Sequence, residues 1–403
     1  MNLSATSLKL KNIYRKNIPE VKAYFKGSYP RFVFDSEAEI INEIPVFTFH
    51  SVKPDVFEQR LEYLYENNYQ TLKAADFLSI ILAQKPMPER SVLLTFDDGW
   101  GSLWTFAYPL LKKYGMHATC FLIPGVINSG AQRHHNLEDV WSGKIGYNSL
   151  IERELSAEPY CTWEEISEMY QSSVFDFQSH TLYHSQVYTS PKIVDFLSPD
   201  FDYAMGHHNV PIVRSNGQDI WDRQLQLGTP IYEYTPRMSG KKRYLDDERL
   251  RLCCTNFVSN HGGVEFFGQK NWRKSLLKVV KDFENKYGAK GYYETQDELE
   301  QGIYTDLISS KQLIQEKLQN NDVNQLCFPY YVGSPLAVKL AKDAGYACSY
   351  WGFIDGKPCN RVGDDPHQVS RLNDDFIFLL PGNRRKKFHQ LFADKFRTRF
   401  LMN

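Results

Sequence analysis

The sequence lacks the features that mark several protein classes. Its seven cysteines include no C-x-x-C pair, and an odd number scattered over 403 residues indicates reduced thiols rather than a disulfide scaffold. No apolar segment approaches the roughly 20 residues of a membrane helix, and no signal-peptide pattern or internal repeat is present. With 42% hydrophobic and 24% charged residues, the chain does not have the composition of a disordered protein. We therefore expect a folded, cytoplasmic protein.

An excess of one charge sign is also missing, because the net charge is −1. This balance excludes a chain that binds nucleic acids generally. The charge is nevertheless segregated, since residues 1–31 and 381–403 each carry seven basic side chains and one acid around an acidic body. An amphipathic helix in 381–403 either packs on the fold or contacts the anionic inner face of a membrane. It is predicted from apolar residues at spacings of three and four: Phe388, Leu391, Phe392, Phe396 and Phe400.

Short apolar runs alternate with helical patterns along most of the chain. A capping box of Thr162 and Glu165 opens one of the helices. This alternation predicts an α/β fold with a parallel sheet, open or closed into a barrel. Residues 127–160 and about 198–293 break the rhythm, and we expect two insertions there rather than a second domain. Strands are predicted at Ile44–Phe49, Ser91–Phe96, Ala118–Ile123, Val174–Gln178, Leu326–Phe328, Tyr346–Trp351 and Phe376–Leu380.

Two adjacent carboxylates, Asp97 and Asp98, follow one of these strands in the run T-F-D-D-G. Catalytic groups of parallel α/β folds sit at the carboxyl ends of strands. Adjacent carboxylates repel each other, and a bound cation relieves the repulsion, so that one aspartate can ligate a metal while the other remains a base. A helix N-cap is the alternative interpretation of an aspartate at this place.

A histidine pair, His180 and His184, follows another predicted strand. Histidines four apart share a face if the segment is helical, and can converge on one ion. Two imidazoles and one carboxylate leave a metal position open for water, as in hydrolytic metal sites. The spacing of the two histidines is by itself weak evidence for a metal site. Its combination with an aspartate doublet at the end of another strand favours such a site.

Two further runs end strands with polar or turn-forming residues. In Cys327-Phe328-Pro329-Tyr330, proline and an aromatic residue follow the strand. One interpretation is that a backbone N–H is exposed there and stabilises an oxyanion, and the other is that the chain simply leaves the sheet at this point. His50 ends the first strand, either as a structural histidine or as a general acid.

Taken in this order, the runs resemble the polysaccharide deacetylase family (carbohydrate esterase family four, with the NodB-homology domain). T-F-D-D-G and H-T-x-x-H match the first two motifs of that family. The resemblance implies a distorted (β/α) barrel, here at residues 42–380, between a basic arm (1–41) and the basic C-terminal helix (381–403). It further implies that Asp97 is the general base and that the Tyr330 N–H stabilises the oxyanion. Asp98, His180 and His184 would be the three ligands of a divalent ion, with zinc as the expected metal.

Two elements of the family pattern are absent: the arginine that usually begins the third motif, and the late L-x-H motif that supplies the acid histidine. In the circularly permuted branch of biofilm poly-N-acetylglucosamine deacetylases, that histidine arrives on the first strand, which Ile44–Val52 resembles. The resemblance therefore implies His50 as the acid. Arg371 is our candidate for the arginine that orients the base.

The resemblance implies a metal-dependent hydrolase that removes an N-acyl group, acetyl or formyl, from an amino sugar of a cell-envelope glycan or lipid-linked saccharide. Its partner is then an N-acylated saccharide and not a nucleic acid, and the basic termini would allow peripheral contact with the inner face of the membrane. Two alternatives stay open. One is an amidase that uses the same fold and metal on a small non-sugar amide, and the other is a non-catalytic glycan-binding protein on a deacetylase scaffold.

Overall fold

The computed structural model describes residues 22–35, 37–127, 130, 132–156, 158–201, 211–220, 224–288, 290–319 and 322–401. The chain divides into two compact units. The first unit contains Met1–His180, Leu313–Cys327 and Tyr346–Asn403, and the second contains Thr181–Gln312 and Phe328–Gly345. The segment 127–160 belongs to the first unit, whereas 198–293 lies entirely in the second.

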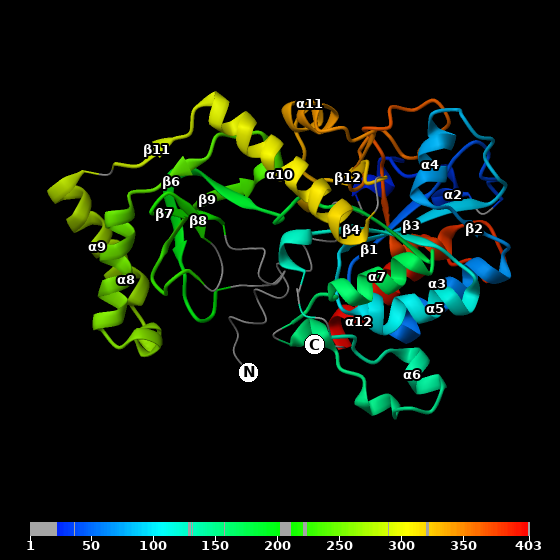
Figure 1. The fold of residues 1–403 in the computed structure, drawn as a ribbon, viewed down its shortest axis with the longest axis horizontal. Helices are drawn as coiled ribbons and strands as arrows, with labels where there is room; N and C mark the ends of the chain where they lie inside the picture. Colours follow the sequence, from blue (N-terminus) through cyan, green and yellow to red (C-terminus); the bar gives the residue numbers. More distant parts are fainter. Residues whose placement is uncertain are drawn as a thin grey trace. The chain divides into compact units, whose positions relative to one another are not determined.

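The first unit is built on an eight-stranded parallel sheet flanked by helices (Figure 1). Val369 forms a parallel bridge with Tyr350, so that the segment 369–373 joins the two edges of the curled sheet. The expected α/β fold, a distorted (β/α) barrel, is confirmed. The strands lie in the order β13 (Cys348–Tyr350), β12 (Gln325–Cys327), β5 (Phe175–Ser179), β4 (Ala118–Leu122), β3 (Ser91–Asp98), β1 (Val46–Phe49) and β14 (Leu372–Asn373), with β2 (Gln70–Thr71) paired to β3.

The burial of these strands on both faces explains why they are continuous apolar runs in the sequence. All eight residues of β3 are buried, as expected for a parallel strand covered on both faces. The capping box is confirmed, because the Thr162 hydroxyl accepts from the Glu165 N–H and the Glu165 carboxylate accepts from the Thr162 N–H. Helices pack their apolar faces on this core: α3 (Pro54–Glu66), α4 (Ala74–Ile81), α5 (Tyr108–Tyr114) and α7 (Trp163–Gln171).

One strand prediction is wrong. The run Phe376–Leu380 lies in a 3-10 helix, Asp374–Leu379, and the last strand ends before it at Asn373. Phe376, Ile377 and Leu379 are buried in the core of the first unit, which a short helical turn achieves as well as a strand. A short apolar run does not distinguish the two by periodicity.

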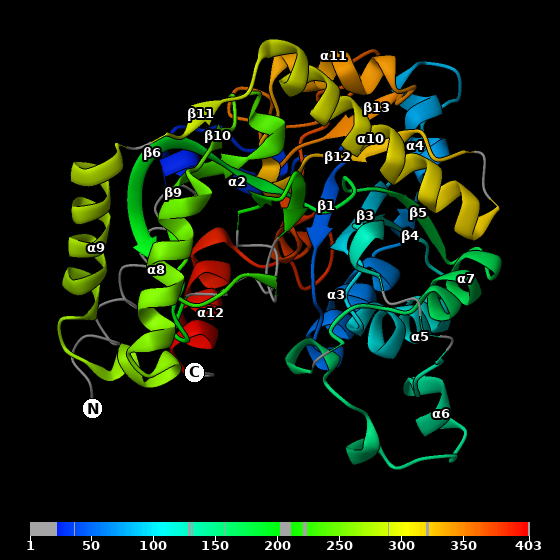
Figure 2. The same ribbon diagram turned by 60° about the vertical axis from the view of Figure 1, so that its left-hand side comes forward.

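The second unit contains antiparallel strand pairs and helices. Helices α8 and α9 lie side by side and share a small core with Leu250, Cys254 and Leu276 (Figure 2). None of the helices in the described part of the chain has the length and hydrophobicity that crossing a bilayer requires. The elements are β6 (Gln186–Phe196) paired with β9 (Pro230–Pro236), β7 (Val213–Ser215) with β8 (Gln218–Ile220), β10 (Tyr244–Leu245) with β11 (Tyr292–Tyr293), and helices α8 (Glu248–Asn260), α9 (Trp272–Tyr287), α11 (Pro335–Asp343) and α10 (Gln296–Leu318), of which α10 ends in the first unit.

The predicted C-terminal helix is present as α12 (Phe388–Leu401). Its first turns pack on the first unit, because the Phe388 ring stacks on Tyr24 at 3.9 Å between centroids and Leu391 is buried. The side chains from Lys395 onward, including Phe396 and Phe400, lie outside the described residues. Contact with a membrane stays a prediction.

Candidate active site

The carboxyl ends of β1, β3 and β5 bring predicted site residues together in the first unit. His50 directly follows β1, Asp97 and Asp98 end β3, and His180 directly follows β5. Asp98 has a left-handed backbone with φ 78°, and such strain is found where a site requires it. Gly99 continues the turn at φ 90°, and a Cβ there would lie 2.8 Å from Leu122 Cδ2. The glycine of T-F-D-D-G is therefore required both by backbone geometry and by space.

Asp97 forms a buried, bidentate ion pair with Arg371. Arg371 Nη1 lies 2.7 Å from Asp97 Oδ1, and Nη2 lies 2.8 Å from Oδ2, with both side chains 1% or less exposed. The guanidinium is itself held by the Trp351 carbonyl and the Thr95 hydroxyl. Burial alone would raise the pKa of Asp97, but the Arg371 guanidinium, together with His180 and His50, outweighs burial and holds this pKa well below its usual range. Asp97 is therefore ionised and fixed in orientation at neutral pH.

Asp98 faces His180 rather than the arginine. His180 Nδ1 lies 2.8 Å from the Cys327 carbonyl, and because a carbonyl only accepts, the hydrogen bond places a proton on Nδ1. In the neutral ring, Nε2 then presents its lone pair, 3.5 Å from Asp98 Oδ1. The Asp98 carboxylate oxygen and the His180 lone pair are thus directed at each other, and both are buried. This arrangement is suited to binding one cation between them, such as Zn²⁺.

His50 is the most accessible of the grouped residues. Its Nε2 lies 3.9 Å from Asp97 Oδ2, and its side chain is 39% exposed, whereas that of Asp97 is 1% exposed. It can therefore reach both the Asp97 carboxylate and a molecule arriving from solvent.

His184 and Tyr330 belong to the second unit, where their ring centroids lie 4.3 Å apart. The segment from Thr181 is a turn and not a helix, since the His184 N–H donates to the Thr181 hydroxyl and both residues have positive φ. Chain length alone keeps the His184 Cα within about 14 Å of the His180 Cα. Tyr330 also has a left-handed backbone, with φ 55°, and its hydroxyl accepts from Gln186 Nε2 at 2.8 Å.

Two residues beside the predicted ones were not singled out from the sequence. Trp100 Nε1 donates to Asp98 Oδ2 at 2.9 Å, and the Cys327 Sγ lies 2.9 Å from Arg371 Nη2. Trp100 directly follows T-F-D-D-G, and this position next to the motif was the signal in the sequence that could have identified it as a site residue. Cys327 was named only as the first residue of the third run and given no role, because a cysteine in an apolar strand is usually an inert buried thiol.

Comparisons with known proteins agree with the motifs. Residues 84–198 match the family model described as Polysaccharide deacetylase. The poly-beta-1,6-N-acetyl-D-glucosamine N-deacetylase of Staphylococcus aureus (strain MSSA476) is 31% identical over 160 residues, which cover 40% of this chain and 44% of that protein. The protein of the same name from Escherichia coli (strain K12) is 27% identical over 150 residues, 37% of this chain and 20% of that protein.

A solved de-N-acetylase from Aggregatibacter actinomycetemcomitans is 17% identical, with a TM-score of 0.49, over 87% of this chain and 99% of that chain. The match to each of these two curated relatives covers less than half of the relative's own length. The matches agree with the resemblance inferred from the motifs, and residues 84–198 carry the similarity to the polysaccharide deacetylase family.

Proposed function

We propose that the protein is a metal-dependent hydrolase that removes the acetyl group from an N-acetylated amino sugar of a glycan. The observation that carries the proposal is the pair of buried aspartates with separate partners: Asp97 with Arg371, and Asp98 with His180. This arrangement separates a carboxylate available as a base from a carboxylate available as a ligand. The names of the two curated relatives support a poly-β-1,6-N-acetylglucosamine substrate.

In this proposal Asp98, His180 and His184 hold the divalent ion. The donor set of one carboxylate and two imidazoles suits zinc and leaves room for water and substrate. Trp100 and the Cys327 carbonyl orient Asp98 and His180 through their hydrogen bonds. When bound, the ion would supply Lewis-acid activation of the amide carbonyl and of water.

The chain's own residues supply the proton transfers. Asp97, kept ionised by Arg371, accepts a proton from the attacking water. The Tyr330 N–H donates a hydrogen bond to the developing oxyanion. His50, as imidazolium, donates its proton to the departing nitrogen, so that one water and one amide become a free amine and a carboxylic acid. Formyl in place of acetyl would follow the same steps.

The His180→Ala variant tests both the metal and the reaction. We expect it to bind Zn²⁺ at least about 100-fold more weakly and to release no measurable acetate from N-acetylglucosamine oligomers, because the ring supplies a ligand. Metal content is measured on the purified protein, and acetate is measured with and without added Zn²⁺. The matched control is His117→Ala, which removes a half-buried ring hydrogen-bonded to the Ser173 carbonyl. Activity retained by His180→Ala, or wild-type turnover of a simple amide but not of the oligomers, would contradict the proposal.

The Trp100→Phe variant tests the orientation of Asp98. It keeps a ring against Tyr160 but removes the N–H that holds Asp98 Oδ2, so we expect Zn²⁺ affinity to fall about tenfold to 100-fold. A competition titration against a zinc-binding dye measures this loss. Trp104→Phe is the control, because the Trp104 N–H donates to the His134 carbonyl instead. Equal affinities of the Trp100→Phe and Trp104→Phe variants would refute the role of Trp100.

A further inference from the structure

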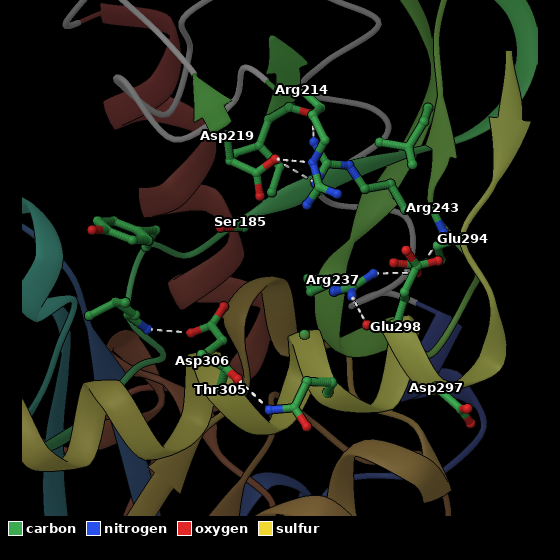
Figure 3. A pocket seen from close by; sticks show the side chains of 16 residues that line it. Ser185, Arg214, Asp219, Arg237, Arg243, Glu294, Asp297, Glu298, Thr305 and Asp306 are labelled. Carbon is green, nitrogen blue, oxygen red and sulfur yellow. Dashed lines mark hydrogen bonds and ion pairs between the residues drawn. The ribbon is translucent and has the colours of Figure 1, made fainter. Parts of the chain in front are cut away.

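The second unit contains a cavity of about 650 Å³ that the proposed reaction does not use (Figure 3). All of its lining residues lie between positions 182 and 306, within that unit. The volume falls in the range of sites that hold small ligands. Its lining is unusual for such a site, because three arginines and five acidic residues contribute to it.

One wall is an Arg–Asp–Arg arrangement of Arg214 on β7, Asp219 on β8 and Arg243, which directly precedes β10. Arg214 and Asp219 are directly opposite each other in the strand register, with Arg214 Nε 3.4 Å from Asp219 Oδ1. Arg243 Nη1 lies 2.8 Å from the same oxygen, and the Arg243 side chain is only 6% exposed. Two guanidiniums therefore share one carboxylate, and this wall keeps an excess of hydrogen-bond donors.

The opposite wall is one face of α10. Asp297, Gln301 and Thr305 are spaced by four residues, as are Glu298, Gly302 and Asp306, so they lie on adjacent lines of the same helix face. The Arg237 guanidinium lies against Gly302, which leaves no room for a Cβ at that position, and it pairs with Glu294. With Arg237 neutralised in this way, the α10 wall is acidic, and Figure 3 shows it facing the arginine wall.

The cavity is linked to the histidine motif by the chain itself. Leu182 and Tyr183 line it, and they lie between His180 and His184 in the sequence. Asp306 Oδ1 accepts the Leu182 N–H at 2.6 Å, which ties this segment to α10. A ligand in the cavity therefore contacts the same short turn that carries the proposed metal ligand His184.

The two walls select a ligand by hydrogen-bond chemistry. An arginine only donates and an ionised carboxylate only accepts, whereas a sugar hydroxyl does both and can bridge such groups. The surplus of two acidic groups in the lining favours a ligand that is also cationic. A sugar unit with a free amine has both properties, and an N-acetylated unit has only the first.

We propose that this cavity binds a de-N-acylated amino-sugar unit of the glycan, separate from the unit being hydrolysed. The inference rests on the proposed function for the identity of the glycan. It implies that the enzyme prefers glycans that already carry free amines. Deacylation of one sugar then promotes binding of the glycan for deacylation of the next sugar.

The test measures binding without turnover, on the full chain carrying Asp97→Asn and loaded with Zn²⁺. Calorimetry compares a β-1,6-linked glucosamine tetrasaccharide with its fully N-acetylated counterpart. We expect the free amine form to bind about three- to tenfold more tightly, as one partly exposed ionic contact allows. Adding Asp297→Asn should abolish this preference. Asp297 is chosen rather than its neighbour Glu298. The Glu298 carboxylate accepts the Thr295 N–H and so caps α10, and replacing Glu298 would therefore disturb the helix.

The matched control is Asp282→Asn, an exposed aspartate on α9 outside the cavity, which should keep the preference. Equal affinity for the two tetrasaccharides, or equal loss from both Asp→Asn variants, would overturn the inference. Absence of acetate release by the wild-type enzyme would instead contradict the proposed function, and it leaves the binding comparison intact.

Discussion

Replacing Asp97 by asparagine is expected to lower kcat about 10²- to 10⁴-fold while leaving bound Zn²⁺ unchanged. The range is that of a general base in hydrolytic enzymes. The variant keeps nearly the same volume in a fully buried place but replaces the basic carboxylate, which would accept a proton from water, with a neutral amide that is not basic. Asp97 is paired with Arg371 and not with the proposed ligands, so the metal should remain. Acetate release and metal content measured on the same preparation test both halves of the expectation.

The control for Asp97→Asn is the same change at a half-buried carboxylate of the first unit. Asp176 lies on β5 and accepts from Gln178 Nε2 at 3.1 Å, away from the carboxyl end of the strand. The Asp176→Asn variant should keep most of its activity. Full activity of Asp97→Asn, or loss of its metal, would refute the separation of base and ligand.

Replacing Arg371 by methionine is expected to affect stability, pH dependence and rate together. Removing one partner of a buried ion pair leaves Asp97 as an uncompensated charge, which typically costs about 3–5 kcal/mol. Burial then raises the pKa of Asp97 with only His180 and His50 left to lower it, whereas in the wild type the guanidinium also keeps this pKa low. The acidic limb of the kcat/KM profile should therefore move to higher pH in the variant.

The pH dependence of stability provides a second check with a defined sign. In the wild type the depressed pKa of Asp97 stabilises the fold above the unfolded-state value of about 3.9, and this contribution is lost as the pH falls through the folded-state value. In Arg371→Met the loss of the guanidinium raises the folded-state pKa of Asp97, so acidification costs the variant less stability than it costs the wild type. The difference in unfolding free energy between the two proteins should shrink as the pH is lowered.

Urea unfolding at several pH values measures this difference. The control is Arg361→Met, which removes an arginine paired with Glu43 at 2.7 Å, and its 59% exposed side chain should contribute at most about 1 kcal/mol. An acidic limb that does not move, or a stability loss equal to that of Arg361→Met, would show that Arg371 does not control Asp97.

The local parts of the site were predictable because their signals are local. A strand followed by T-F-D-D-G fixes where two carboxylates leave the sheet, and Gly99 has the positive φ that such a turn needs. The histidine run follows β5 in the same way. The pairing of Asp97 with Arg371 joins residues 274 positions apart, and the sequence offered Arg371 only as a candidate for the arginine missing from the third motif.

By itself, the sequence determined the parallel α/β framework and the short runs that carry the site, because strand periodicity and motif spacing are properties of neighbouring residues. Only the tertiary structure decided that Phe376–Leu380 is a helical turn, that Trp100 holds Asp98, and that a charged cavity adjoins the histidine turn. It also decided that Arg371 reaches Asp97. The physical reason is that these contacts depend on strand register and on how the sheet curls until the segment 369–373 joins its edges. Both result from packing the whole core, and no local pattern encodes them.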